Sequence, residues 1–123
     1  MSERARDAPV SSELLVCIVK DHHQVEEILM GFLELGLRGA TVVDARGMGQ
    51  ILSTQVPIFT GFRSLFPGGA AGTYMILSVV ESERLDDAIR LAEEVCGDFC
   101  QPGTGFLFTV PVRRVCGLAQ QIR

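Results

Sequence analysis

Residues 14–47 are LLVCIVKDHHQVEEILMGFLELGLRGATVVDARG, and this stretch decides the fold. Its first seven residues form an apolar run that is typical of a buried strand. Asp21 then stands where a helix-capping residue is expected, and apolar residues recur at helical spacing from Val25 to Leu35. Gly36 is expected to end this helix in a left-handed conformation. Residues 40–46, ATVVDAR, follow as a second strand, so the stretch predicts strand–helix–strand.

The second half of the chain repeats this order. Residues 73–80, TYMILSVV, predict a strand, and Ser82 is expected to cap the helix that follows. The apolar face of that helix is formed by Leu85, Ala88, Ile89, Ala92 and Val95. Gly97 ends the helix, and residues 106–112, FLFTVPV, predict the last strand. The order βαββαβ predicts an α+β fold of the ferredoxin-like, split βαβ type, with an antiparallel sheet and both helices on one face.

The opposite face of this sheet is expected to be bare. Its strands are apolar on both sides, as the adjacent pairs Val16–Cys17 and Ile76–Leu77 show. A bare apolar face is most easily buried against other copies of the same chain. The sequence therefore predicts a homo-oligomer.

A long loop separates the two halves. Residues 47–72, GMGQILSTQVPIFTGFRSLFPGGAAG, keep no regular period, and Arg63 is their only charge. Disordered segments are polar and charged, whereas long loops in compact domains are often functional. The predicted organisation is a flexible tail at 1–12, a single domain at 13–118 that contains this loop, and a C-terminal tail at 119–123.

Composition narrows the function. The chain has 123 residues and a net charge of −4, which argues against nucleic acid as a partner. No apolar run reaches about 18 residues, so no membrane insertion is expected. The first residues lack the apolar segment of a secretion signal, and four cysteines without such a signal are expected to be reduced thiols. The predicted location is the cytoplasm.

No catalytic or metal site is predicted. His22 and His23 are neighbours on a helix and point about 100° apart, so they seldom bind one metal together. Cys96 and Cys100 are four residues apart, but Gly97 interrupts the helix between them. Two other classes stay open on this fold: a small ferredoxin-like oligomeric enzyme with an apolar substrate between sheet and loop, and a metal-tolerance-type trimer.

Residues 14–118 resemble the P-II-like family, the wider group of nitrogen-regulatory P-II signalling proteins, as a divergent member. The resemblance rests on LGLRGATVVDARGMG at 35–49, on the long loop that follows, on ILSVVESERLDDAI at 76–89 and on GTGFLFTVPV at 103–112. These segments look like the approach to the family's T-loop, its third strand and second helix, and its B-loop and fourth strand.

The resemblance implies a homotrimer that is not an enzyme and takes part in nitrogen signal transduction. It implies an adenine nucleotide (ATP, ADP or AMP) between subunits, held where glycines let backbone N–H groups approach phosphates. The implied binding residues are Thr41, Gly47, Met48, Gly49 and Gln50 on one side, and Gly103, Thr104, Gly105 and Phe106 on the other. It also implies that the long loop regulates a partner, such as a membrane transporter or a metabolic enzyme.

Several family positions differ here. Phe106 stands where the family has a lysine, Thr104 replaces an acidic residue, and Gly117 and Ala119 fall where arginines are usual. Gln50 also replaces a basic residue, which leaves little support for 2-oxoglutarate sensing. A triphosphate would lose several charge-assisted hydrogen bonds, each worth about 1.5–3 kcal/mol. Weak ATP binding is therefore expected, and a ligand with one phosphate, a neutral adenine ligand or no nucleotide fits the residues as well.

The loop's apolar residues suggest contact with a protein surface. They are Ile58, Phe59, Phe62, Leu65 and Phe66, with Arg63 among them. Two interpretations remain open: the loop packs back on its own trimer as a cap, or it docks in an apolar groove of a partner while Arg63 reaches a carboxylate or phosphate there.

Overall fold

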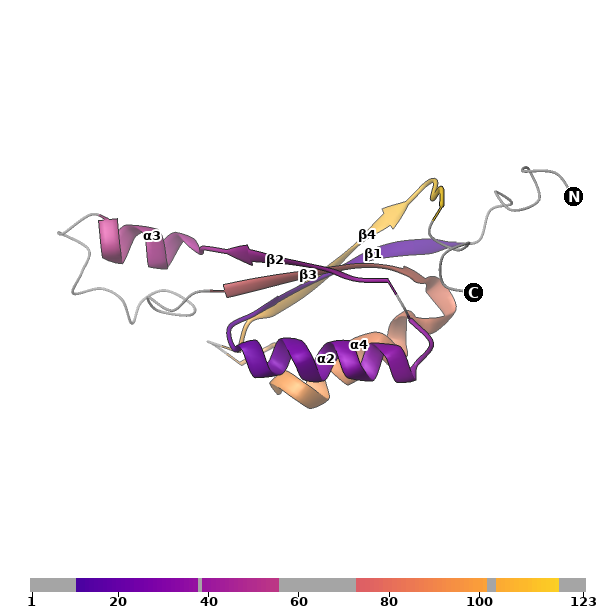
Figure 1. Ribbon diagram of the computed structural model, residues 1–123, viewed down its shortest axis with the longest axis horizontal. Coiled ribbons are helices and arrows are strands. Elements are labelled where there is room, and N and C mark those ends of the chain that lie inside the picture. Colours follow the sequence, from indigo (N-terminus) through magenta and orange to yellow (C-terminus); the bar gives the residue numbers. More distant parts are fainter. Residues whose placement is uncertain (1–10, 38, 56–72, 102–103, 118–123) are drawn as a thin grey trace, which may run out of the picture.

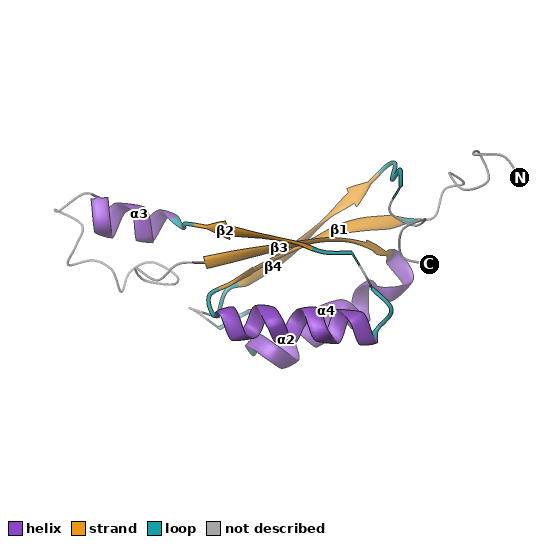
Figure 2. Ribbon diagram, viewed as in Figure 1, coloured by secondary structure: helices purple, strands orange, loops and turns teal. Residues whose placement is uncertain are grey.

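The computed structural model describes residues 11–37, 39–55, 73–101 and 104–117. Its elements in chain order are β1 (Ser12–Val19), α2 (His22–Glu34), β2 (Thr41–Ala45), α3 (Met48–Gln55), β3 (Thr73–Glu81), α4 (Ser82–Cys96) and β4 (Phe106–Val112). The strands form one antiparallel sheet in the order β2-β3-β1-β4. Helices α2 and α4 lie side by side below the same face of this sheet (Figures 1 and 2). The predicted ferredoxin-like α+β fold is confirmed.

Helix α2 begins and ends where the sequence predicts. The Asp21 carboxylate accepts a hydrogen bond of 2.8 Å from a backbone N–H in the first turn. At the other end Gly36 has φ +89°, its N–H donates to the Leu33 carbonyl, and the Leu37 N–H donates to the Phe32 carbonyl. This pair of bonds is the Schellman arrangement, which needs a left-handed residue and so favours glycine.

Helix α4 begins differently from the prediction. Its N-cap residue is Glu81, with no side-chain capping bond, and Ser82 is already the first helical residue. The Ser82 backbone N–H donates to the Ser11 carbonyl at 2.9 Å, and its hydroxyl lies 3.0 Å from the Ser11 hydroxyl. The predicted Ser82 cap is therefore wrong, because this residue fastens the start of the helix to the segment that precedes β1.

The first part of the predicted long loop is an α-helix. Residues 48–55 form α3, which the sequence analysis assigned to an irregular segment, and that assignment is wrong. The Ile51 N–H donates to the Gly47 carbonyl at 3.0 Å, which closes the first turn. The remaining predicted loop residues and one glycine lie outside the described residues: Ile58, Phe59, Phe62, Arg63, Leu65, Phe66 and Gly103.

The core lies between the helices and one face of the sheet. Its fully buried residues are Leu15, Cys17, Val19, Val25, Ile28, Phe32, Ile76, Val80, Ala88 and Ala92. Gly31 of α2 lets the two helices approach closely, because a Cβ at this position would collide with the Leu91 side chain of α4. The buried Ser78 hydroxyl donates to the Gly39 carbonyl at 2.7 Å, so the polar group in this layer is satisfied.

The other face of the sheet is apolar, and no helix of the described residues covers it. Side chains alternate along β1, so Val16 points away from the core, and it is opposite Leu77 and Phe108 in the register. Phe106 and Phe108 are 52% and 46% exposed, and their rings stack with centroids 6.1 Å apart. The bare apolar face expected from the sequence is present.

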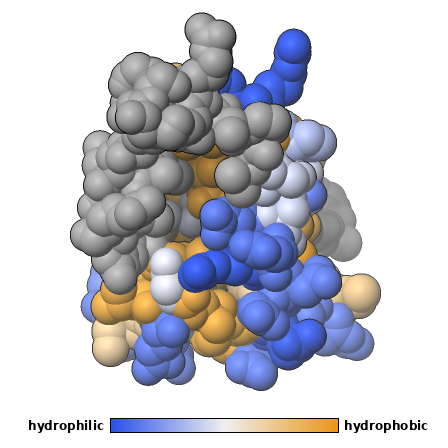
Figure 3. Space-filling model, turned by 90° about the vertical axis from the view of Figure 1, so that its right-hand side faces the viewer, coloured by the Kyte–Doolittle hydropathy of each residue, from blue (hydrophilic) through white to orange (hydrophobic). Residues whose placement is uncertain are grey.

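The helical layer also presents apolar groups to solvent. Met30 of α2 is 64% exposed, and Leu33 is similarly exposed on the same helix. Viewed from the end at which β1 begins and β3 ends, the molecule shows hydrophobic surface beside hydrophilic surface at the level of the helices (Figure 3).

The buried thiol of Cys17 predicts an alkaline loss of stability. Burial, and to a smaller degree the charge of Cys96, raises the pKa of Cys17 from 9.0 to about 12. The folded state disfavours the thiolate. The contribution of the neutral Cys17 thiol to the free energy of unfolding is therefore complete below pH 9 and is lost as the pH rises toward 12. We expect the Cys17 thiol to account for about 2 kcal/mol of the decrease in unfolding free energy between pH 8 and about pH 10.5.

Urea unfolding at both pH values checks this, with Cys17→Val as the comparison. The other ionisable groups are common to both proteins, so their effects cancel in the difference. Equal alkaline losses in the two proteins would show that Cys17 ionises freely in the folded state.

Candidate functional site

The two glycine loops predicted from the sequence lie at the same end of the sheet. In the register of the strands, β2 ends and β3 begins at the level where β1 ends and β4 begins. Residues 46–50 follow β2 there, and residues 104–106 lead into β4 there (Figure 1). We call this end of the molecule, defined by these two segments, the glycine end.

The two loops lie at opposite edges of the sheet. Strands β2 and β4 are the outer strands, with β3 and β1 between them. Three strand spacings of about 4.8 Å separate them by about 14 Å. A single chain therefore does not bring residues 47–50 and 104–106 together around one small ligand.

The segment after β2 has room for a ligand. A Cβ on Gly47 would meet no atom within 4 Å, and the adjacent Met48 side chain is exposed. Gly49 is buried, and Gln50 is partly buried. Thr41 lies at the opposite end of β2, four residues before Ala45 and thus about 13 Å from it. Thr41 of the same chain is not part of the glycine end.

The segment before β4 is shaped by the fold. Gly105 has φ +111°, and a Cβ there would collide with the Ile18 carbonyl oxygen of β1. The glycine is thus explained by the close approach of two backbones, without a ligand. Thr104 is partly buried, and its N–H donates to the Gln101 carbonyl at 3.4 Å. Phe106 stacks on Phe108 over the open face.

Two cations at the glycine end were missed by the sequence analysis. Lys20, which is partly buried, follows β1 directly, and the exposed Arg46 follows β2 directly. Each is the last residue of a predicted strand, and a cation at the end of an apolar run was the available signal. Arg113 and Arg114 follow the other end of β4, seven residues and about 23 Å from its start. Within one chain, these two arginines are too far away to take the role of the family lysine whose position Phe106 occupies.

The first turn of α2 also lies at the glycine end. The His22 ring meets Tyr74 of β3 edge to face, with centroids 5.8 Å apart. The Nδ1 atoms of His22 and His23 lie 3.6 and 3.9 Å from the Glu26 carboxylate. No three potential ligands among the described residues are grouped to hold a metal ion.

The thiols near the end of α4 are poor nucleophiles. Burial and then the charge of Glu27 raise the pKa of Cys96, and the charge of Asp98 raises the pKa of the exposed Cys100. A thiol reacts as its thiolate, so a raised pKa lowers its reactivity at neutral pH. All four cysteines are free. This part of the molecule therefore offers weak nucleophiles.

The comparisons with known proteins agree with the architecture. No protein-family model matches the chain, and no curated protein matches it. Among solved structures, it is similar to the crystal structure of Arabidopsis thaliana PII bound to citrate, with a TM-score of 0.60 and 20% sequence identity. The match covers 84% of this chain and 78% of that one. The fold is P-II-like.

A membrane-spanning helix must be long and apolar, and no helix among the described residues meets both conditions.

The two loop glycines should respond differently to substitution. Gly47→Trp places its side chain in open space, so we expect it to lower the unfolding free energy by about 1 kcal/mol or less, the scale of an altered helix cap. Gly105→Ala forces a Cβ against backbone at positive φ and should lower it by about 1–3 kcal/mol. Urea unfolding of both variants checks this; a larger loss for Gly47→Trp would mean that its surroundings are occupied.

Proposed function

We propose that the chain is an effector-binding regulatory protein, not an enzyme, that works as a homotrimer with its effector sites between copies. The observation that carries this proposal is the placement of the two glycine loops at one end of the sheet and at its opposite edges. In a ring of copies, the β2 edge of one chain meets the β4 edge of the next. Each boundary then holds a complete pair of loops.

The bare sheet face supports the same assembly. Burying a large apolar side chain fully contributes about 1.5–3 kcal/mol relative to leaving it in water. Phe106, Phe108 and Val110 of β4 and Val43 of β2 all remain partly exposed on this face in the single chain. Three sheets facing a common centre would bury these side chains and align the edges that carry the loops.

The effector we propose is a small anion that carries carboxylate or phosphate groups. Lys20 and Arg46 supply positive charge at the glycine end, and the open space beside Gly47 leaves backbone N–H groups accessible. The similar Arabidopsis PII was crystallised with citrate, a tricarboxylate. An adenine nucleotide remains a candidate, held by residues 47–50 of one copy and residues 103–106 of the next, with weaker phosphate contacts than in the P-II family.

The regulated partner would bind near the segment that follows β2. Met48 and Ile51 of α3 present apolar side chains to solvent. We propose that α3 and residues 56–72 form the contact with a cytoplasmic enzyme or the cytoplasmic side of a transporter, as the T-loop does in P-II proteins. Nitrogen is the nutrient that the resemblance suggests.

Assembly can be tested by substitution on the bare face. We expect the native chain to sediment as a trimer at micromolar concentration, and Phe108→Glu to sediment as a monomer because it places a charge in an apolar interface. Leu33→Glu, on the exposed side of α2, is the matched control and should remain trimeric. A monomeric native chain in sedimentation equilibrium would overturn the proposed assembly.

Effector binding can be tested by calorimetry with citrate, ATP, ADP and AMP. We expect at least one of them to bind, and Arg46→Ala to weaken that binding about tenfold, since a charge-assisted hydrogen bond contributes about 1.5–3 kcal/mol. Gly47→Trp should abolish binding by filling the open space. Arg113→Ala is the control with unchanged affinity, because Arg113 follows the far end of β4. Equal losses for Arg46→Ala and Arg113→Ala would place the effector elsewhere.

A further inference from the structure

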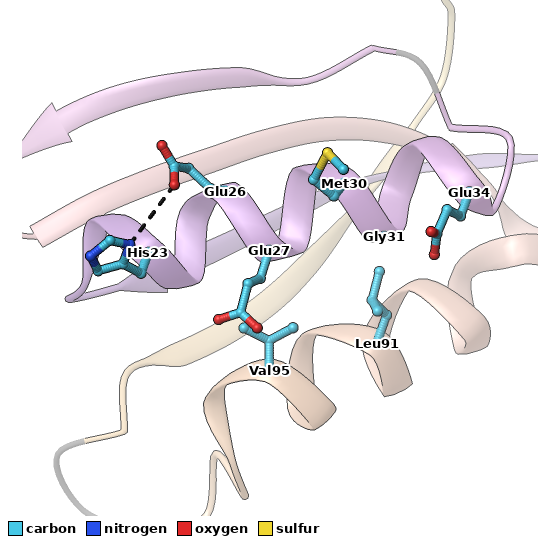
Figure 4. A pocket seen from close by; sticks show the side chains of 8 residues that line it. All are labelled: His23, Glu26, Glu27, Met30, Gly31, Glu34, Leu91 and Val95. Atoms are coloured by element: carbon cyan, nitrogen blue, oxygen red, sulfur yellow. Dashed lines mark ion pairs between the residues drawn. The ribbon is translucent and has the colours of Figure 1, made fainter.

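The outer side of the helical layer contains a groove between α2 and α4. Its volume is about 580 Å³. It is lined by His23, Glu26, Glu27, Met30, Gly31 and Glu34 of α2, and by Leu91 and Val95 of α4. Figure 4 shows Glu27 and Glu34 extending from α2 toward α4, and Leu91 and Val95 extending from α4 toward α2. His23 and Glu26 lie where the first turn of α2 reaches the glycine end, and the other lining residues lie further along the helices.

The floor of the groove is apolar. Leu91 packs against the bare backbone of Gly31, and Val95 lies one helical turn further along α4. A glycine inside a helix costs about 1 kcal/mol relative to alanine, and here the close helix contact explains its presence. Met30 is 64% exposed at the edge of the groove, so a flexible apolar side chain faces solvent next to this floor.

The rim of the groove is strongly acidic. Helix α2 carries three glutamates and neither lysine nor arginine, while α4 carries five acidic residues and two arginines. Both arginines are engaged elsewhere: Arg84 donates to the Leu35 carbonyl, and Arg90 pairs with Asp87 at 3.0 Å. The negative charge of Glu27 on α2 acts on α4, because it adds to the effect of burial in raising the pKa of Cys96.

The dimensions suit a helix. The lining residues of α2 run from His23 to Glu34, which is about 16 Å or three turns at 1.5 Å per residue. A groove between two packed helices accepts the side-chain ridge of a third, and helix-in-groove recognition combines such apolar anchors with flanking charges. We propose that this groove binds an amphipathic helix of a partner protein, with apolar anchors on the Leu91–Val95 floor and lysines or arginines against Glu27 and Glu34.

This surface is independent of the assembly proposed above. The groove lies on the helical layer, and the bare apolar face lies on the other side of the sheet (Figure 2). Copies that cover the bare face would leave the groove open to solvent. Failure of the groove proposal would therefore leave the effector proposal intact, and failure of the effector proposal would leave the groove.

The test uses the whole chain and a synthetic fluorescein-labelled helix of about four turns. The helix has leucines on one side, at positions i, i+4, i+7 and i+11, and lysine and arginine on both flanks. We expect fluorescence anisotropy to show saturable binding that weakens as salt rises from about 50 to about 300 mM. Glu27→Lys combined with Glu34→Lys should weaken it about tenfold, and Met30→Ser about fivefold.

Matched variants separate a groove from general attraction between opposite charges. Leu33→Ser removes a similarly exposed apolar side chain from α2, and Glu93→Lys combined with Glu94→Lys reverses two exposed charges on α4, yet none of these residues lines the groove. Both should retain binding within about twofold. Circular dichroism confirms that each variant is folded. Binding that survives replacement of the peptide leucines by serine, or that falls equally in the groove and control variants, would overturn the proposal.

Discussion

The central strand β1 is apolar on both faces, and the rest of the architecture follows from this property. On one face Leu15, Cys17 and Val19 are fully buried against α2 and α4. On the other face Val16 is also buried, and its partners in the register are Leu77 and Phe108. Two helices connected as βαβ units cover a single face of a four-stranded sheet. The second face consequently keeps exposed apolar side chains among the described residues, such as Phe106, Phe108 and Val110.

The split βαβ topology also determines what a single chain can bind. Each βαβ unit places its second strand at an edge of the sheet, so the segments after β2 and before β4 are separated by two inner strands. The same antiparallel register brings both segments to one end. Covering the bare face and pairing the two loops are thus geometrically compatible, and the proposed ring of copies would do both. This reasoning does not depend on the identity of the effector.

Much of the fold was predictable because its signals are local. Apolar runs, helical spacing, Asp21 and Gly36 each act within a few residues, and the structure agrees with the sequence at each of them. The errors arose where a short sequence signal was compatible with more than one local structure. Helix α3 has eight residues, too few for a clear helical period, and Ser82 was assigned a cap although it binds Ser11 across the chain.

The candidate site was less predictable because it depends on tertiary distances. The sequence pairs Gly47 and Gly105 as two phosphate-binding positions, but one has open space and the other is required by contact with β1. The sequence likewise cannot show that Arg46 lies at the same end of the sheet as both loops, or that Arg113 lies at the other end. Strand register supplies that information, and it comes from long-range pairing.

Helices α2 and α4 carry more than half of the acidic residues of the chain, whereas the glycine end carries charges of both signs, with Lys20 and Arg46 beside Asp21 and Asp44. The whole chain has a net charge of −4, yet α2 and α4 together contain eight acidic residues and only two arginines, so the remainder of the chain is net positive. Lys20 and Arg46 belong to that remainder, at the end proposed for an anion. An anionic effector and a basic partner helix would therefore not compete for one surface.

Helix α2 connects these two surfaces. Its first turn contacts Tyr74 at the glycine end through His22, and its outer side forms the acidic wall of the groove. Any coupling between the two ligands must be reciprocal: a factor by which the effector changes the affinity for the helix equals the factor by which the helix changes the affinity for the effector. A shift or rotation of α2 against β3 is the simplest movement that both sites would sense, because α2 contributes residues to both. The Gly31–Leu91 contact opposes sliding of α2 along α4, because Leu91 packs where a Cβ on α2 would collide with it.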